Sequence, residues 1–360
     1  ISVDDVIENI KNTNTDLLKH EDKNILSKMI KYYQDNNEFI YSFTDQEKNF
    51  LSRNHKDKWV EYLIYRYKFK VYPEEKIKMD FPVHILIELS SACNLRCVMC
   101  FQSDSSFQKA GKYIGTMDIN LFKNIIDQAH EGGTKAITFA SRGEPLYHKE
   151  IEEALSYVKG KFTEIKINTN AMLLNEKKSH LILQNCENLT LVFSIDAYTK
   201  ELYEKIRVRG NFEKVLGNIR NFNKIKNEFY PDAKVVTRAS GVIISQQQDV
   251  NKLAEFWRNE VDEVSFEMAE QMADTYNNKP SDINHPCNFL WENMYIWFDG
   301  KCNPCDLDYK SELEFGNVKN ASIKNIWNGS RLEILRKKHI EGNRNKIMPC
   351  DRCGVDFSLN

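Results

Sequence analysis

Apolar residues recur at helical spacing through the first part of this chain and at strand spacing after it. Residues 1–80 are polar overall, and capping boxes mark two helix starts at Ser2–Asp5 and Thr44–Glu47. Phe81-Pro82 ends the helical pattern, because the residue before a proline disfavours helical backbone. The first 80 residues are therefore predicted to form a helical N-terminal extension.

From residue 84 onward, short β-rich runs alternate with amphipathic helical segments. The first of these helical segments begins at Asp118, a good N-cap, and ends at Gly132-Gly133. A strand followed by a helix, repeated six times, predicts a parallel sheet. The predicted strands are residues 84–90, 135–140, 163–168, 189–195, 234–244 and 261–267, and the predicted helices include 118–131, 148–159, 175–186 and 249–259.

Two architectures fit six βα units: a flat, doubly wound sheet and a curved, incomplete barrel. A polar cluster follows every predicted strand, from Ser90–Cys100 after the first to Glu267–Glu270 after the last. Active sites of parallel α/β folds lie at the carboxyl ends of strands, and contributions from all six strands indicate one central mouth. We predict an α/β fold with a partial (βα)6 TIM-like barrel over residues 81–280.

Composition narrows the possible partners and the compartment. Lys and Arg number 50 against 52 Asp and Glu, so no global field attracts nucleic acid or an anionic membrane. No stretch approaches the roughly 18 apolar residues of a membrane span, and the first residues do not read as a secretory signal. We predict a cytoplasmic protein, in which nine cysteines indicate metal binding or catalysis rather than disulfides. Five of them lie in residues 281–360, which are predicted to form a separate small domain.

The most specific motif is a trio of cysteines directly after the first predicted strand, Cys93, Cys97 and Cys100. Thiolates select zinc or iron–sulfur clusters. A structural zinc site needs a fourth ligand, and this loop has no histidine to supply it. A [4Fe–4S] cluster held by three cysteines instead keeps one iron open for a substrate or cofactor. The arrangement resembles the signature of the radical S-adenosylmethionine (SAM) superfamily.

That resemblance implies that SAM binds the open iron and that a flavodoxin- or ferredoxin-type donor supplies an electron. SAM is then cleaved to a 5′-deoxyadenosyl radical, which abstracts hydrogen from a substrate. Arg142 stands where the family's Gly-Gly-Glu-Pro motif has its first glycine, so this side chain is free to face the substrate. The positions that match the family's cofactor-binding residues are Met99, Gly143, Glu144, Pro145, Asn168, Asn170, Ser194, Arg207, Val242 and Ile244.

The C-terminal cysteines resemble the SPASM domain, the superfamily's module for auxiliary iron–sulfur clusters. The matching pattern is a cysteine, a dozen residues, Gly300, four residues, a cysteine, a long gap and a final Cys-x2-Cys. No further cysteine follows in this sequence, so the resemblance implies one auxiliary [4Fe–4S] cluster in addition to the SAM-binding one. Its ligands would be Cys287, Cys305, Cys350 and Cys353.

Cys302 is left over by that assignment and has three interpretations. With Cys305, Cys350 and Cys353 it makes a rival four-cysteine zinc ribbon. As a thiol near the substrate it could return a hydrogen atom to a carbon radical, as a radical epimerase requires. The third and favoured interpretation is a small residue packed beside a cluster.

Acidic residues at strand ends complete the predicted catalytic group. Glu267, Glu270 and Asp196 follow strands where a substrate would lie, and a carboxylate there can remove a proton from a substrate radical. With Cys302, they predict oxidation or epimerisation. By resemblance to enzymes with one auxiliary cluster, a carbohydrate-like small molecule is the leading substrate. A peptide-modifying maturase is the alternative, and a non-catalytic iron–sulfur or zinc protein is the second alternative.

Overall fold

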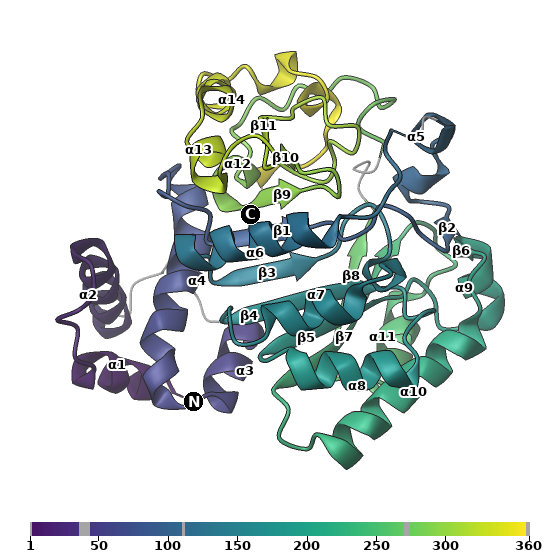
Figure 1. Ribbon diagram of the computed structural model, residues 1–360, viewed down its shortest axis with the longest axis horizontal. Coiled ribbons are helices and arrows are strands. Elements are labelled where there is room, and N and C mark those ends of the chain that lie inside the picture. The colour runs from purple at the N-terminus through teal and green to yellow at the C-terminus, as the bar shows by residue number, and fades with distance from the viewer. Residues whose placement is uncertain (1, 36–43, 110–111, 270–273, 358–360) are drawn as a thin grey trace. The chain divides into compact units, whose positions relative to one another are not determined.

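The computed structural model describes residues 2–35, 44–109, 112–269 and 274–357, and the chain divides into two compact units, residues 1–79 and 80–360 (Figure 1).

The first unit is helical, and its helices begin where the capping boxes predict. The side chains of Ser2 and Thr44 each accept a hydrogen bond from the N3 backbone amide, and their own backbone amides donate to the N3 carboxylate in return. Glu47, the N3 residue of the second box, is fully buried and pairs with Arg66 at 2.9 Å and Lys70 at 2.8 Å. The helices are α1 (Val3–Asn12), α2 (His20–Asp35), α3 (Asp45–Arg53), η1 (Lys56–Lys58) and α4 (Trp59–Glu74).

The second unit is built on one nine-stranded sheet in the order β11-β10-β9-β1-β3-β4-β5-β7-β8. Its six βα strands lie side by side in chain order and all run parallel. A doubly wound sheet reverses its strand order, and this one does not, so the predicted barrel-type winding is confirmed. These strands are β1 (His84–Ile87), β3 (Ala136–Phe139), β4 (Glu164–Thr169), β5 (Leu189–Ser194), β7 (Val235–Ile243) and β8 (Glu263–Met268).

The two faces of the parallel strands differ in polarity. Ile165 and Ile167 of β4 join the main apolar core with the helices, whereas Lys166 and Asn168 alternate with them and face the opposite, inner side. Figure 1 shows α6, α7 and α8 along the outer face of the sheet. The connecting helices are α6 (Ile119–Gly132), α7 (Ile151–Val158), α8 (Glu176–Asn185), α9 (Lys200–Ile206), α10 (Phe212–Phe229) and α11 (Val250–Arg258).

The cysteine-rich segment continues the same sheet. β9 (Met294–Ile296) pairs in parallel with β1, and β10 (Lys301–Asn303) and β11 (Gly316–Asn317) follow as antiparallel strands. The described part of the segment also contains the helices α12 (Phe289–Glu292), α13 (Ile323–Trp327), α14 (Ser330–Ile340), η4 (Arg344–Lys346) and η5 (Cys350–Arg352). Among the described residues, no helix combines the length and the apolar character needed to cross a bilayer.

Candidate functional site

The three N-terminal cysteines lie on the loop that leaves β1. Backbone amides of Leu95 and Gln102 approach the Sγ atoms of Cys93 and Cys100, both at 3.4 Å. Burial raises the pKa of Cys93 to about 11 and that of Cys100 to about 12. In the apoprotein these thiols therefore stay protonated at neutral pH, and binding a metal releases their protons.

A short antiparallel strand pair, β2 (Arg96–Cys97) with β6 (Arg207–Val208), places the positively charged side chain of Arg207 beside this loop. The pair sets Cys97 opposite Arg207, whose Nη1 lies 3.8 Å from the Cys97 Sγ. Arg207 Nε also pairs with Asp196 Oδ2 at 2.7 Å, and the Val242 amide donates to Asp196 Oδ1 at 2.8 Å. Two predicted site residues thus meet, and Asp196 is fully buried and engaged by both partners. This arrangement favours a positioning role for Asp196.

The Gly143-Glu144 segment joins the cysteine loop to the end of β4. A Cβ on Gly143 would lie 2.3 Å from the Ser90 carbonyl oxygen, so only glycine allows this approach. The Glu144 amide donates to the Ala92 carbonyl at 3.0 Å. Its carboxylate accepts from Thr169 Oγ1 at 2.7 Å and the Asn170 amide at 2.8 Å. Glu144 therefore holds together the two segments on which the predicted cofactor residues lie.

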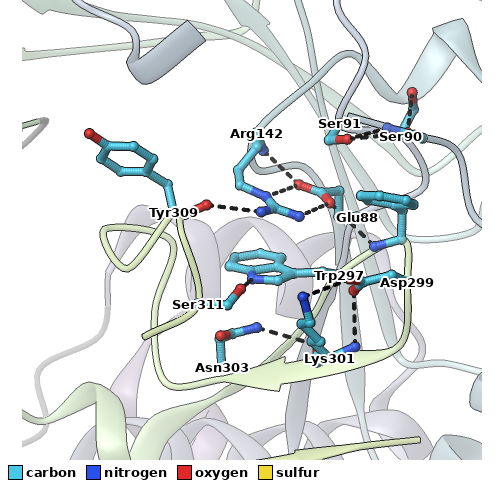
Figure 2. Close-up of polar contacts among 12 residues, drawn as sticks. Glu88, Ser90, Ser91, Arg142, Trp297, Asp299, Lys301, Asn303, Tyr309 and Ser311 are labelled. Carbon is cyan, nitrogen blue, oxygen red and sulfur yellow. Dashed lines mark hydrogen bonds and ion pairs between the residues drawn. The ribbon is translucent and has the colours of Figure 1, made fainter. Parts of the chain in front are cut away.

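Arg142 does not face a substrate space; it is buried in a polar bridge (Figure 2). Its Nε and Nη2 donate to the two carboxylate oxygens of Glu88 at 2.7 and 2.6 Å. Nη1 donates to the Tyr309 carbonyl at 2.9 Å, and the guanidinium lies 4.4 Å from the Trp297 ring centroid. Because Tyr309 follows Cys305 by four residues, Arg142 ties the loop after β3 to the second cysteine region.

The remaining predicted cofactor residues lie at or near the strand ends. Asn168 lies on the inner face of β4, and its Oδ1 is buried without a hydrogen-bond partner among the described residues. Asn170 follows β4, and its Nδ2 lies 3.0 Å from Asn94 Oδ1 and 3.8 Å from Cys93 Sγ. Ser194 ends β5, Val242 lies on β7, Ile244 follows β7, Met99 is half-buried on the cysteine loop, and Pro145 begins η3 (Pro145–Tyr147).

Four C-terminal cysteines form the second set, and Cys302 is not one of them. The pKa of Cys305 is raised by burial and by Cys287 and Cys350, and burial likewise raises the pKa of Cys350, with Cys287 and Cys353 adding to it. Cys302 is fully buried in the main apolar core. This placement favours packing over the zinc-ribbon and hydrogen-donor interpretations.

Further groups surround this second set. Burial raises the pKa of Cys287 to about 11, and the buried Arg344 guanidinium, which donates to the Val355 carbonyl at 2.7 Å, opposes that effect. Asp306 directly follows Cys305, and burial raises the pKa of its carboxyl. Among the described residues, no three His, Cys, Asp or Glu side chains are grouped as they are around a single metal ion. Each cysteine set is therefore recognised by the effect that its cysteines have on the pKa of others in the same set.

Glu267 and Glu270 are the two other acidic residues predicted at the site. Glu267 lies on β8, is exposed, and is paired in register with Val242. Glu270 lies outside the described residues.

Similarity to known proteins identifies both cysteine regions. The sequence profile of the radical SAM superfamily matches residues 87–271, just over half of the chain, and that of the SPASM iron–sulfur cluster-binding domain matches residues 287–354. This chain belongs to the radical SAM superfamily. The resemblance inferred from the two cysteine motifs is thereby confirmed.

Two curated relatives and two solved structures are similar to this chain. The chain is 24% identical to a cysteine-type anaerobic sulfatase-maturating enzyme of Clostridium novyi (strain NT), over 73% of this chain and 83% of that one. It is 23% identical to the subtilosin biosynthesis protein AlbA of Bacillus subtilis (strain 168), over 72% of this chain and 62% of AlbA. Two structures share the fold: Streptococcus suis SuiB bound to precursor peptide SuiA (TM-score 0.57, 16% identical, 91% and 87% covered) and BtrN with AdoMet and 2-DOIA (0.52, 18%, 76% and 93%).

The cofactors of this radical SAM enzyme are SAM, a SAM-binding [4Fe–4S] cluster and an auxiliary [4Fe–4S] cluster. The residues present fit these groups. Backbone amides and a guanidinium approach the sulfurs of the first set, and such donors stabilise thiolates. The unpartnered Asn168 Oδ1 leaves an acceptor for a bound cofactor. The proposed ligands are therefore Cys93, Cys97 and Cys100 for the first cluster, and Cys287, Cys305, Cys350 and Cys353 for the second.

Sequence reasoning missed several radical SAM site residues that act through long-range contacts. The Gln102 amide group donates to the carbonyls of Ser91, at 2.7 Å, and Arg142. Gln248 Nε2 donates to the carbonyls of Asp196 and Val242, at 2.8 and 2.7 Å. No local pattern marks a glutamine for such a role. Glu88 carried one signal, because it is a lone carboxylate in an otherwise apolar strand pattern.

Proposed function

We propose that this protein is a radical SAM maturase that modifies a residue of a peptide or protein substrate. The observation that carries the proposal is the 24% identity to a sulfatase-maturating enzyme, which spans 73% of this chain and 83% of that relative. Similarity to AlbA, a bacteriocin biosynthesis protein, supports the same class, although the match covers less than two thirds of AlbA. The peptide alternative therefore ranks above the carbohydrate-like substrate favoured by sequence reasoning.

The inner face of the barrel is the proposed place for the substrate. When bound, SAM and its cluster supply a 5′-deoxyadenosyl radical that takes a hydrogen atom from a substrate carbon. The proposed work of this chain is to hold the cofactor with Asn168, Asn170 and Ser194 and to hold the methionine carboxylate with Arg207. Donors that carry a charge suit that carboxylate.

Two carboxyl groups are the proposed proton acceptors for a substrate radical. Glu267 lies on β8, one strand beyond Val242, and is accessible. Asp306 lies near Tyr295 on β9: burial raises the pKa of the Tyr295 phenol, and the charge of Asp306 adds to this effect. An electron removed from the substrate would pass to the second cluster. A flavodoxin- or ferredoxin-type donor would supply the electron that is needed to cleave SAM.

A small-molecule substrate is the second candidate. It is supported by the fold shared with BtrN, whose structure contains 2-DOIA. Its reaction would be the oxidation or epimerisation expected from the sequence.

The test supplies the anaerobically reconstituted protein with SAM, dithionite and synthetic peptides encoded by short reading frames beside its gene. Sugar nucleotides and aminocyclitols form the competing arm. We expect one peptide to change mass in step with 5′-deoxyadenosine formation, and Glu267→Gln or Asp306→Asn to slow that change. Consumption of a small molecule with every peptide unaltered would overturn the proposal.

A further inference from the structure

The inner face of the barrel carries a lysine that the cofactor chemistry does not use. Lys166 lies at the middle of β4, between Ile165 and Ile167, which point into the apolar core. Strand alternation therefore directs its side chain to the inner face, where Asn168 follows two residues later. Two residues along a strand span about 7 Å, so Lys166 lies one step below a proposed cofactor residue.

Lys166 has neighbours of both charges but no contact with them. Arg238 and Glu267 face it from β7 and β8, and Glu164 precedes it on the same face of β4. Its ammonium forms no hydrogen bond or ion pair with any part of the chain that the structure describes. Burial lowers the pKa of Lys166, Arg238 adds to this effect, and Glu267 and Glu164 oppose it. Lys166 is half-buried, and a bound anion can supply the partner that its ammonium lacks among the described residues.

The neighbouring arginine is already neutralised. Arg238 Nε and Nη2 donate to Glu263 Oε2 at 2.9 and 2.6 Å, which forms an ion pair between β7 and β8. The charges of Lys166, Glu164, Arg238, Glu263 and Glu267 on this face sum to minus one, and the Arg238–Glu263 ion pair leaves Lys166 as the cation that can pair with a ligand. A single negative charge can be held beside Lys166, whereas a dianion such as phosphate would also meet the carboxylate of Glu267.

From this placement we infer that Lys166 binds a carboxylate of the substrate peptide and so determines which peptides the barrel accepts. The inference rests on the proposed function, because it assumes a peptide inside the barrel. The carboxylate can come from an Asp or Glu side chain or from the C-terminus of the peptide. Binding at Lys166 would hold the substrate below the cofactor and direct a nearby carbon toward it.

The test measures which peptides the reconstituted enzyme retains in the presence of SAM. Two bead libraries of random octapeptides serve as probes, one attached through the C-terminus and one through the N-terminus with a free carboxylate. Wild type is compared with Lys166→Met, Lys166→Arg and Lys166→Glu. Lys224→Met is the matched control, because Lys224 is exposed on α10. Iron content and circular dichroism show which variants have folded.

We expect wild type and Lys166→Arg to enrich carboxylate-bearing peptides at least about tenfold over Lys166→Met, the effect of one charged hydrogen bond. Lys166→Glu should enrich Lys or Arg, and Lys224→Met should match wild type. Enrichment of Asp or Glu in both libraries identifies a side-chain carboxylate, and enrichment only with free C-termini identifies the terminus.

Two outcomes are separable failures. If wild type and Lys166→Met retain the same peptides, this inference is wrong while the proposed function stands. If wild type retains no peptide from either library, the proposed function itself fails, and the inference falls with it.

Discussion

The two cysteine sets are surrounded differently. The first lies on a loop reached by side chains from two other segments, since Asn170 Nδ2 and Arg207 Nη1 each lie 3.8 Å from a sulfur. In the second set, burial raises the pKa of Cys287, Cys305 and Cys350, neighbouring cysteines add to this effect, and the buried Arg344 ties the segment down. Three ligands with polar neighbours leave room for a cofactor, whereas four ligands close a cluster. We therefore propose that the first set performs the chemistry and that the second transfers electrons.

Removing one ligand from each set should break this comparison most clearly. Cys93→Ala should abolish 5′-deoxyadenosine formation, because a cluster with two ligands cannot be kept. Cys287→Ala should lose about half of the roughly eight irons that two clusters hold, while some SAM cleavage remains. Iron analysis and chromatography of the products provide the measurements.

The control for both variants is Cys186→Ala, since Cys186 is buried in the core at the end of α8. It should leave the iron content unchanged. Loss of both clusters from either ligand variant would contradict two independent sites.

The Arg142–Glu88 bridge connects the two regions, and breaking it should give the next largest effect. Arg142→Met leaves Glu88 buried without its counter-charge, which should cost about 3–5 kcal/mol of unfolding free energy. The double variant with Glu88→Gln should cost less, because no charge is then stranded. Denaturant unfolding of the four members of this double-mutant cycle measures the coupling.

Arg220 and Glu260 provide the matched pair for that cycle, because Arg220 is 59% exposed in its ion pair with Glu260. Arg220→Met should change stability by about 1 kcal/mol or less. A bridge variant no worse than this control would show that the two regions are held together by other contacts.

A substitution of Arg207 tests the cofactor site at the first cysteine set alone. Arg207→Lys keeps the charge beside Cys97 but loses the planar fork, so SAM affinity should fall about tenfold. Equilibrium dialysis of SAM measures this, and iron content shows whether the cluster remains. Arg209→Lys, two residues further along, should leave affinity unchanged. Equal affinities in wild type and Arg207→Lys would remove Arg207 from the cofactor site.

The smallest effect is expected at Cys302, which separates packing from ligation. Cys302→Ala removes one buried atom and should cost about 1 kcal/mol, with iron content and SAM cleavage intact. Thermal unfolding and iron analysis are the measurements. Loss of iron would restore the zinc-ribbon or cluster-ligand interpretation, and loss of solvent deuterium incorporation into a product would restore the hydrogen donor.

Helices and strands with a regular spacing of apolar residues were predictable from the sequence. The barrel-type order of the strands was predicted from the polar clusters at the strand ends. All six predicted strands and the helix after Asp118 are present, because apolar spacing and capping are local properties. The strand pair β2–β6 was not predicted, since each strand has only two residues and no period. The continuation of the sheet by β9 was also missed, because strand pairing across two hundred residues leaves no local trace.

The site was predictable as a set of motifs but not as a set of contacts. The cysteine spacings and Gly143-Glu144 led to the radical SAM and SPASM assignments, which the matching profiles confirm. The partners of Arg142 and Asp196 could not be read from the sequence, because both lie in ion pairs closed by tertiary structure. Lys166 was not predicted as a site residue, because a lysine in a strand is usually exposed.

The pairing of β1 with β9 also has a consequence for synthesis of the chain. Strand β1 is complete at residue 87, but one of its edges is covered only by residues 294–296. While the ribosome makes the intervening segment, that edge offers free backbone donors and acceptors to other nascent chains. At roughly 5–20 residues per second the exposure lasts on the order of ten seconds or more. The yield of soluble protein should therefore depend on chaperone supply during translation, and truncation before β9 should produce aggregates.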